Sequence, residues 1–325
     1  MIDMTSCNNG SLVTFIVFCY NQSDFIEEAI QGALDQDYTP LQIIISDDCS
    51  IDKTFLIAQR IVDKYKGPHQ ITLIRNEENL GLIGHVNKVL GLAQGDLIIV
   101  SAGDDVSLPN RTKRIVDERF KIGKSLFLIH SDVLTIDKYG RELGRWSPPI
   151  EARRWSLAEI AVCEAIYIGA SAAFSQSLIN KFDPIKFKNA WEDLVWGFRA
   201  SMLDALIYIP EPLVKYRVGV GISSDVDDRL CFKSMLRTHR HIRLVQIDVL
   251  EQRLYDVKSL HFYGGNEVAM AIKSQLNVEK IRFQLSLKPA RTILFNSFIN
   301  PVSLVKALFY DVRWMVNYVY NKIIQ

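Results

Sequence analysis

Four short apolar runs mark the first third of the chain, at residues 13–19, 42–45, 71–74 and 97–100. Apolar runs of this length are typical of strands that are buried on both faces of a parallel sheet. Between the runs, apolar residues recur at helical spacing, as they do from Phe25 to Leu34. The alternation predicts right-handed βαβ units and a doubly wound, mostly parallel α/β sheet.

Local signals place the ends of these elements. We expect Ser23 and Ser50 to cap the first two helices, and Pro109 to open a further helix. Past residue 120 the pattern predicts less regular elements. These are a strand at 126–129, a hairpin and mobile loop at 137–151, a helix that opens at Trp191-Glu192-Asp193, and a last strand at 205–209.

The pattern also divides the chain. We expect a sheet domain at 1–228, made of a nucleotide-binding half at 12–120 and an acceptor half at 121–228, followed by a helical region at 229–325. Within the acceptor half, residues 166–174 are small and apolar, which lets a ligand approach closely.

Charge sets the last region apart. From Arg229 onward there are 15 Lys and Arg against 6 Asp and Glu, a balance of +9, while the rest of the chain has 23 against 31, a balance of −8. The basic residues alternate with aromatic ones such as Phe309 and Trp314, a composition typical of helices that lie in a membrane interface. A helical cap on the sheet domain and a dimer contact are the alternatives. We recognise no nucleic-acid module and expect no nucleic-acid partner.

The composition also indicates the cellular compartment. The five cysteines are scattered and odd in number, which suits a reducing cytoplasm. No basic patch opens a signal peptide, no apolar run reaches 18 residues, and the run from Leu12 to Tyr20 is too short to cross a bilayer. We therefore expect a cytoplasmic protein that can lie on the inner face of the plasma membrane.

Polar residues follow three of the predicted strands, at Tyr20-Asn21, Asp47-Asp48 and Asp104-Asp105. Parallel strands end at one edge of the sheet, where ligands bind in open α/β folds. An acidic pair there can hold a divalent cation, which in turn holds phosphate oxygens. A surface turn is the plainer interpretation of Gly103-Asp104-Asp105. The first strand is not followed by a G-x-G-x-x-G motif and the chain has no P-loop, which disfavours a dinucleotide site and a P-loop enzyme.

Five short motifs in this order resemble those of family 2 glycosyltransferases. They are Thr14-Phe15-Ile16-Val17-Phe18-Cys19-Tyr20-Asn21, Ser46-Asp47-Asp48-Cys49-Ser50-Ile51-Asp52-Lys53-Thr54, Asn79-Leu80-Gly81 with Asn87, Gly103-Asp104-Asp105, and Glu192-Asp193. The chain departs from the family in three places. Phe18 stands where proline is common, Cys49 replaces a glycine, and Ala102 stands where the metal motif has its first aspartate.

The resemblance covers about residues 12–220 and implies a GT-A fold and a metal-dependent, inverting, hexosyltransferase-like enzyme. It implies transfer from a UDP- or dTDP-sugar to a hydroxyl of a saccharide acceptor, lipid-linked, in the synthesis of surface polysaccharide such as lipopolysaccharide O-antigen. The implied catalytic residues are Asp193, as base, and Glu192. The implied nucleotide-sugar ligands are Phe18, Tyr20, Asn21, Asp47, Asp48, Asn79, Gly81, Asn87 and Asp104. Asp104 and Asp105 would hold Mn²⁺ or Mg²⁺.

Several alternatives stay open. Glu192-Asp193 can be ordinary first-turn acids of a helix, and Asp47-Asp48 a turn before one. His130 can pack or contact an acceptor, and Tyr216-Arg217 can contact the diphosphate or pair locally. A sugar-nucleotide nucleotidyltransferase uses a similar sheet, but it would carry a Gly-rich basic loop after the first strand. A non-catalytic sugar-nucleotide-binding protein finds support in Ala102.

Overall fold

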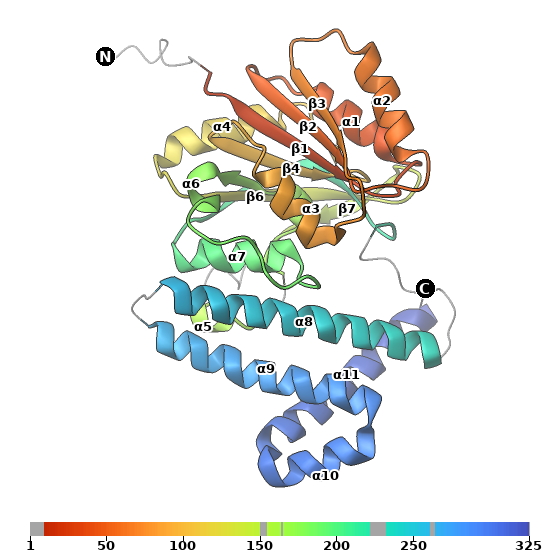
Figure 1. The fold of residues 1–325 in the computed structure, drawn as a ribbon, viewed down its shortest axis with the longest axis vertical. Coiled ribbons are helices and arrows are strands. Elements are labelled where there is room, and N and C mark those ends of the chain that lie inside the picture. The colour runs from red at the N-terminus through yellow and green to blue at the C-terminus, as the bar shows by residue number, and fades with distance from the viewer. Residues whose placement is uncertain (1–9, 150–154, 164, 222–231, 261–263, 325) are drawn as a thin grey trace.

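A single mixed sheet organises the N-terminal two thirds of the chain (Figure 1). The computed structural model describes residues 10–149, 155–163, 165–221, 232–260 and 264–324. The strands of the sheet are β1 (Val13–Cys19), β2 (Leu41–Asp47), β3 (Gln70–Arg75), β4 (Leu97–Ala102), β5 (Val106–Ser107), β6 (Leu128–Ile136), β7 (Glu142–Trp146), β8 (Ala173–Ser175) and β9 (Leu206–Arg217).

The strand order is β3-β2-β1-β4-β8-β6-β9-β5, with β7 paired to β6 as an antiparallel hairpin. The first four strands run parallel, β8 is antiparallel to its two neighbours, and β6 and β9 are again parallel. The chain passes from β1 outward to β2 and β3 and then returns to β4 on the other side of β1. A crevice at such a reversal of strand order is the usual ligand site of open α/β sheets. The predicted doubly wound, mostly parallel sheet is confirmed.

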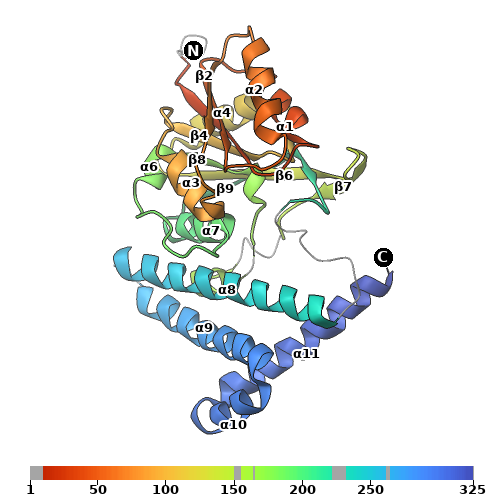
Figure 2. The ribbon, with the colours of Figure 1, turned by 45° about the vertical axis from the view of Figure 1, so that its right-hand side comes forward.

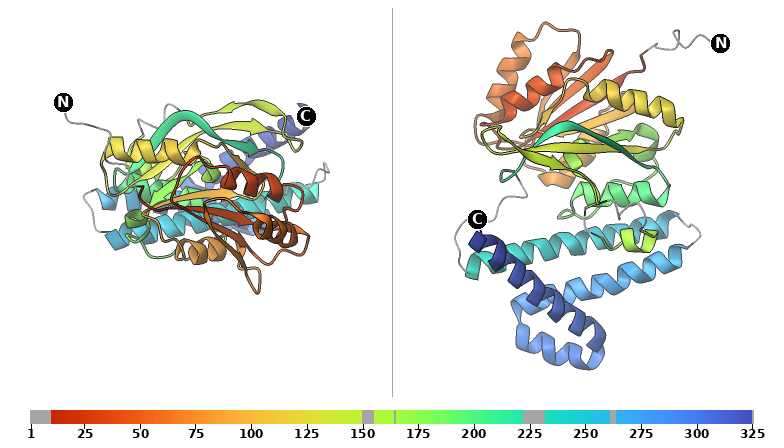
Figure 3. Two further views of the ribbon diagram at one scale, coloured as in Figure 1. Left: turned by 90° about the horizontal axis from the view of Figure 1, so that it is seen from above. Right: turned by 180° about the vertical axis from the view of Figure 1, so that it is seen from behind.

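Helices cover both faces of the sheet (Figure 1, Figure 3). On one face Phe15, Ile43 and Ile99 pack with α1, α2 and α4, and on the other Ile16, Ile44 and Ile98 pack with α3 and α7. The alternation along each strand sends successive side chains into opposite cores, which is why these strands are apolar throughout. These helices are α1 (Ile26–Leu34), α2 (Thr54–Lys64), α3 (Gly81–Leu90), α4 (Arg111–Ile122) and α7 (Glu192–Met202).

Short helices connect the last strands, and four longer ones follow the sheet. They are α5 (Leu157–Ile160), α6 (Gln176–Ile179), α8 (Phe232–Leu260), α9 (Gly265–Leu287), α10 (Pro289–Ile299) and α11 (Pro301–Ile324). Helix α7 lies between the sheet and α8, and α9 packs on the opposite side of α8 (Figure 2). Helices α10 and α11 pack on α9; α10 lies at the end of the molecule farthest from β1–β4, and α11 runs from there back toward the start of α8. The tail is therefore helical, as predicted.

The structure corrects two local predictions. Neither Ser23 nor Ser50 caps a helix, because α1 and α2 begin later, after Phe25 and Lys53. The Ser50 hydroxyl instead accepts a hydrogen bond from the main-chain N–H of Asn21, 2.9 Å away. The two serines lie in two neighbouring loops. Main-chain N–H groups of one loop donate to side chains of the other, and neither serine acts as a helix cap.

The last strand is also longer than predicted. The prediction ended it at Ile209 because Pro210 follows, but β9 continues through Pro212 to Arg217. The pairing of β9 with β6 shifts register at Ser131 and Asp132, which accommodates two residues that lack an N–H. The helix expected to open at Pro109 begins two residues later, at Arg111. The boundary at 228 lies outside the described residues.

Candidate active site

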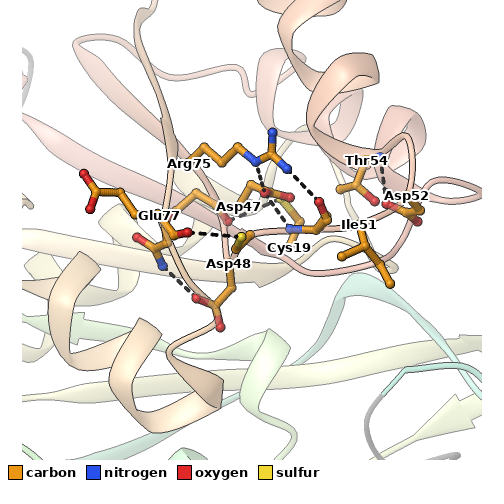
Figure 4. Close-up of polar contacts among 12 residues, drawn as sticks. Cys19, Asp47, Asp48, Ile51, Asp52, Thr54, Arg75 and Glu77 are labelled. Carbon is orange, nitrogen blue, oxygen red and sulfur yellow. Dashed lines mark hydrogen bonds and ion pairs between the residues drawn. The ribbon is translucent and has the colours of Figure 1, made fainter.

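Asp47 ends β2 with its carboxylate turned into the following loop (Figure 4). Its Oδ1 atom accepts a hydrogen bond from the main-chain N–H of Ser50 at 3.0 Å and lies 3.6 Å from Nε of Arg75. Arg75 also donates to the Ser50 carbonyl at 2.8 Å. Burial, and next the charge of Asp47, raises the pKa of the neighbouring Cys19 thiol well above its usual range. Asp47 therefore holds the β2–α2 loop against β3.

Asp48 points to the other side of this loop. Its Oδ1 atom accepts hydrogen bonds from Nδ2 of Asn76 at 2.7 Å and from the N–H of Leu80 at 3.0 Å. The side chain is 3% exposed. These contacts join the ends of β2 and β3 to the start of α3. Binding of the base by Asp47 or Asp48 stays a prediction.

Four further predicted ligands lie in loops at the same sheet edge. Tyr20 is 38% exposed, directly after β1. Asn21 has a left-handed backbone with φ 51°, and its Oδ1 atom accepts a hydrogen bond from the β2–α2 loop at 2.9 Å. Asn79 is exposed and its Oδ1 atom accepts the N–H of Gly81 at 2.8 Å, where Gly81 has φ 69°. The structure thus brings these residues together beside Asp47 and Asp48.

Asn87 lies elsewhere, on the face of α3 that meets the acceptor half. Its Nδ2 donates to the carbonyl of Ile185 at 2.8 Å, and its Oδ1 accepts the Ile185 N–H at 3.1 Å. Both ends of the amide are engaged by main chain. This geometry makes Asn87 a clamp between α3 and the segment before α7. Phe18, the remaining residue in the predicted set for the base and sugar, is half-buried and meets the ring of His85 edge-on at 5.1 Å.

The side chains of Asp104 and Asp105 have different surroundings. Asp105 is 1% exposed and its Oδ1 atom accepts the main-chain N–H of Arg217 at 2.8 Å. Burial, and next the charge of Asp104, raises the pKa of Asp105 well above its usual range. Asp104 is 8% exposed, and burial raises its pKa while a hydrogen bond from Gln22 opposes the rise. Asp104 is therefore the more accessible carboxylate of the pair.

Two buried arginines hold the turn that carries these aspartates. Arg217 donates to the Asp104 carbonyl at 2.9 Å and forms an ion pair with Glu28 at 2.7 Å. Arg111 donates to the Val100 carbonyl at 2.9 Å, and burial lowers its pKa to about 9. In this structure the Arg217 guanidinium pairs locally, one of the two roles that the sequence left open.

Glu192 and Asp193 form the first turn of α7, and Gly169 lies directly against them. A Cβ atom on Gly169 would stand 2.8 Å from Oε1 of Glu192. Asp193 accepts hydrogen bonds from the N–H groups of Leu194, at 2.7 Å, and of Gly169. Removal from water raises the pKa of Asp193 to about 6; removal from water, and next the charge of Asp193, raises that of Glu192 to about 8. Burial thus disfavours a second charge on this pair, and the hydrogen bonds and the Arg253 charge favour the ionised form of Asp193.

The ends of β4 and α7 meet at one cavity. Ala102, two residues before Asp104, lines a cavity of about 90 Å³ together with Gly169 and Glu192. The sequence motifs for the metal and for the base, 90 residues apart, are thus brought to the two sides of a single opening. This is the arrangement that a reaction between a phosphate-bound group and a base requires.

One contact with the candidate base comes from the tail, at a residue that no sequence motif marks. Arg253 of α8 is 2% exposed and donates to the carbonyl of Leu194 at 2.7 Å and to those of Ala161 and Cys163 at 3.1 and 3.0 Å. Its charge lowers the pKa of Asp193, against the effect of burial. The basic residues of the tail looked alike in sequence, and only the packing of α8 on α7 distinguishes this one.

His130 lies under a second cavity. Its ring is 3% exposed and packs 5.4 Å from the ring of Tyr167 and 5.3 Å from that of Tyr208. The cavity has a volume of about 540 Å³ and is lined by His130, Tyr208 and Trp155 among others. His130 thus packs in the core and also faces a space large enough for a saccharide, so both of its predicted roles stay open.

Comparison with known proteins identifies the class. Residues 14–181 match the model of "Glycosyl transferase family 2". The chain is 32% identical over 208 residues to the putative glycosyltransferase EpsE of Bacillus subtilis, covering 62% of this chain and 73% of that protein. It is 33% identical over 141 residues to the succinoglycan biosynthesis protein ExoO of Rhizobium meliloti, covering 43% of this chain but only 38% of that protein. The chain belongs to glycosyl transferase family 2.

Solved structures agree on the fold. The S. aureus protein TarS, residues 1–349 in complex with UDP-GlcNAc, has a TM-score of 0.58 at 15% identity and covers 91% of this chain and 79% of its own. The mannosyltransferase PcManGT of Pyrobaculum calidifontis, in complex with GDP-Man and Mn²⁺, has a TM-score of 0.55 at 16% identity and covers 94% and 80%. The predicted GT-A fold is confirmed.

Among the residues that the structure describes, no helix is both long and apolar enough to span a bilayer. The same residues hold no group of three or more His, Cys, Asp or Glu side chains arranged to bind a metal ion.

Proposed function

We propose that this protein transfers a sugar, with inversion, from a UDP- or dTDP-sugar to a hydroxyl group of a saccharide acceptor in bacterial polysaccharide synthesis. The observation that carries the proposal is that the end of β4 and the start of α7 line one cavity, through Ala102, two residues before Asp104, and Glu192, the residue before Asp193. Membership of family 2 and the names of the relatives support the polysaccharide role.

A divalent cation fits the donor set. Asp104 is one accessible carboxylate, and Ala102 supplies no second ligand. Mg²⁺ is commonly held by one or two carboxylates together with substrate phosphates and waters, so a diphosphate would complete the shell. Asp105, bound to the Arg217 N–H, would hold Asp104 in place rather than reach the ion. When bound, Mn²⁺ or Mg²⁺ would offset the negative charge that gathers on the leaving diphosphate.

Asp193 is suited to act as the base. A carboxylate with a pKa of about 6 is ionised at neutral pH and is still a better proton acceptor than an exposed aspartate. As the acceptor oxygen attacks the anomeric carbon, its proton passes to Asp193 and the bond from that carbon to the diphosphate oxygen breaks. The raised pKa of Glu192, caused by burial and next by the charge of Asp193, favours its protonated form and so leaves the charge on Asp193. A rate of turnover that depends on Asp193 would also separate this enzyme from a non-catalytic binding protein.

Thermal unfolding tests donor and cation together. UDP, dTDP and GDP would each be added with and without Mn²⁺, since a ligand at 100 times its Kd stabilises by about 2.7 kcal/mol. We expect UDP or dTDP to stabilise the protein only with Mn²⁺, and Asp104→Asn to abolish the Mn²⁺ effect. Asp96→Asn is the matched control, because Asp96 is exposed just before the other end of β4. The proposal would be contradicted if neither UDP nor dTDP stabilised the protein, or if Asp104→Asn and Asp96→Asn showed the same Mn²⁺ effect.

An anionic membrane surface is the partner proposed for the tail, consistent with a lipid-linked acceptor. The outer sides of α10 and α11 expose apolar residues, among them Phe295 (60%) and Phe309 (63%). The others are Ile293, Ile299, Val302, Val305, Leu308, Tyr310 and Val312. Lys288, Lys306 and Arg313 are exposed on the same helices or at their start. Exposed apolar and cationic side chains on two neighbouring helices are the groups that bind the interface of an anionic bilayer.

Point variants test the membrane role better than truncation, because α11 packs on α9 and Asp311 pairs with Arg282 at 2.6 Å. The protein should sediment with phosphatidylglycerol liposomes and less with phosphatidylcholine ones. Phe295→Ser/Phe309→Ser should stay in the supernatant, whereas Phe120→Ser, on α4 and 57% exposed, should sediment like the parent. Equal sedimentation of all three would refute the membrane role, and a concentration-dependent dimer lost in the double variant would assign this surface to a second copy.

A further inference from the structure

The cavity between Ala102 and Glu192 has an apolar wall and two unused polar atoms. Phe18, Leu82 and Val86 form part of the wall. Tyr167 and Trp196 also line it, at 1% and 3% exposure, and neither the Tyr167 hydroxyl nor the Trp196 Nε1 has a hydrogen-bond partner among the described residues. A buried polar group without a partner costs about 1–3 kcal/mol, so two in one cavity point to a ligand that supplies partners.

The size of the cavity limits that ligand. Its volume of about 90 Å³ exceeds the about 10–15 Å³ that one water needs, so a group larger than a water fits. Water there would have few polar partners across an apolar wall, and a ligand with an apolar part would displace such water favourably. The matching group is small, combines a methyl with a hydrogen-bond acceptor, and is uncharged.

The position of the cavity indicates which substrate brings this group. Its wall includes Phe18 at the end of β1 and Ala102 at the end of β4, the two strands that flank the crevice. Ala102 stands two residues from Asp104, and a larger side chain there would project into the space. A group that enters the cavity therefore belongs to the sugar next to the diphosphate, not to a distant part of the acceptor.

We propose that this cavity receives the acetamido group of a 2-acetamido sugar on the donor. The inference rests on the proposed function and deepens it. The acetamido carbonyl accepts hydrogen bonds from Trp196 Nε1 and the Tyr167 hydroxyl, and its methyl packs on Phe18, Leu82 and Val86. The parent sugar has a hydroxyl in place of this group and no methyl to fill the apolar part of the cavity. The cavity is thereby a specificity determinant, separate from the base and the cation ligand.

Calorimetric titration with UDP, UDP-glucose, UDP-N-acetylglucosamine, UDP-galactose and UDP-N-acetylgalactosamine tests the inference, with Mn²⁺ present. At least one acetamido sugar should bind about tenfold more tightly than its parent. Tyr167→Phe removes only the hydroxyl, and Trp196→Phe replaces the indole with a smaller aromatic ring that has no N–H. Each should reduce that ratio about threefold to tenfold and leave the affinity for UDP unchanged. Trp191→Phe, a half-buried tryptophan outside the cavity lining, is the matched control and should keep the parent ratio. Circular dichroism would verify that each variant is folded.

The outcomes separate the two levels of the proposal. Binding of UDP with equal affinity for acetamido and parent sugars would overturn the cavity assignment and leave the transferase in place. A loss of UDP affinity in Tyr167→Phe that matches the loss of sugar affinity would also overturn it, because the effect would then be structural. Failure of every nucleotide to bind would instead contradict the proposed function. Should the two phenylalanine variants not fold, Ala102→Leu, which fills the cavity, must abolish the acetamido preference.

Discussion

The tail should control the base through Arg253, and Arg253→Met tests this link. Methionine keeps the long apolar stem and removes the charge and the donors. The carbonyls of Leu194, Ala161 and Cys163 would each lose a buried hydrogen-bond donor, and each such loss costs about 1–3 kcal/mol, which gives a total of about 3–9 kcal/mol. Domains unfold with about 5–15 kcal/mol, so circular dichroism must verify that the variant is folded before its kinetics are compared.

The electrostatic effect has a definite sign. The positive charge of Arg253 favours ionised Asp193, so its removal raises the pKa of Asp193 further. If Asp193 must be ionised to accept a proton, the acidic limb of kcat/KM should move to higher pH in Arg253→Met and move back in Arg253→Lys. The measurement is a pH–rate profile from pH 5 to 9 beside urea unfolding at each pH.

The matched control is Arg243→Met, about three turns before Arg253 in the same helix, α8. Arg243 is 5% exposed and pairs with Glu279 of α9 at 2.6 Å, so its loss should also cost stability. The charged groups that act on Arg243 are Glu279, Arg282 and Asp311, so the acidic limb of kcat/KM in Arg243→Met should stay where the parent has it. If both variants shift the limb equally, or neither does, the proposed coupling of α8 to the base is wrong.

Three further predictions concern single side chains. Gly169→Ala should fold but lose turnover, because its Cβ would meet Glu192 at 2.8 Å, whereas Gly144→Ala, with its nearest atom at 3.9 Å, should not; steady-state kinetics distinguishes them. Glu192→Gln should gain stability relative to the parent as pH rises from about 5 to 8, by at most about 1.4 kcal/mol per pH unit. The reason is that unfolded parent loses the Glu192 proton in this range while folded parent keeps it, which destabilises the parent. Equal urea midpoints across that range would contradict this. Asn87→Ala should lower Tm by removing the clamp to Ile185 without lowering nucleotide affinity in calorimetry, and weakened binding in a folded variant would restore Asn87 to the binding site.

The sheet could be predicted because its signals are local and periodic. Runs such as Leu97 to Val100 are apolar on both faces only because helices cover both, and the structure has that arrangement. The strand-end residues Asn21, Asp48 and Asp104 could be placed together for the same reason, since parallel strands bring their ends to one edge.

What the sequence could not predict depends on packing between distant segments. Asp104 and Asp105 are adjacent and identical in type, and only the approach of Arg217, 112 residues beyond Asp105, gives them different surroundings. Ser50 looked like a helix cap until the neighbouring loop supplied Asn21 as its partner. The charge balance of the tail does not indicate which of its basic residues faces α7, so Arg253 could not be distinguished from its neighbours. Long-range contacts of this kind leave no periodic trace in the chain.

The release of nucleoside diphosphate by the parent and by Asp193→Asn tests the central claim most directly. Each protein would be supplied with the nucleotide sugar that stabilises it most, Mn²⁺, and a lipid-linked saccharide fraction from bacterial membranes. We predict that the parent releases diphosphate at least about 10²-fold faster, the usual scale for a positioned base, while both bind the donor with equal affinity. Equal release by the two proteins would show that Asp193 is not the base. Tight donor binding without release by the parent, with every acceptor fraction, would contradict the claim that this protein is a transferase.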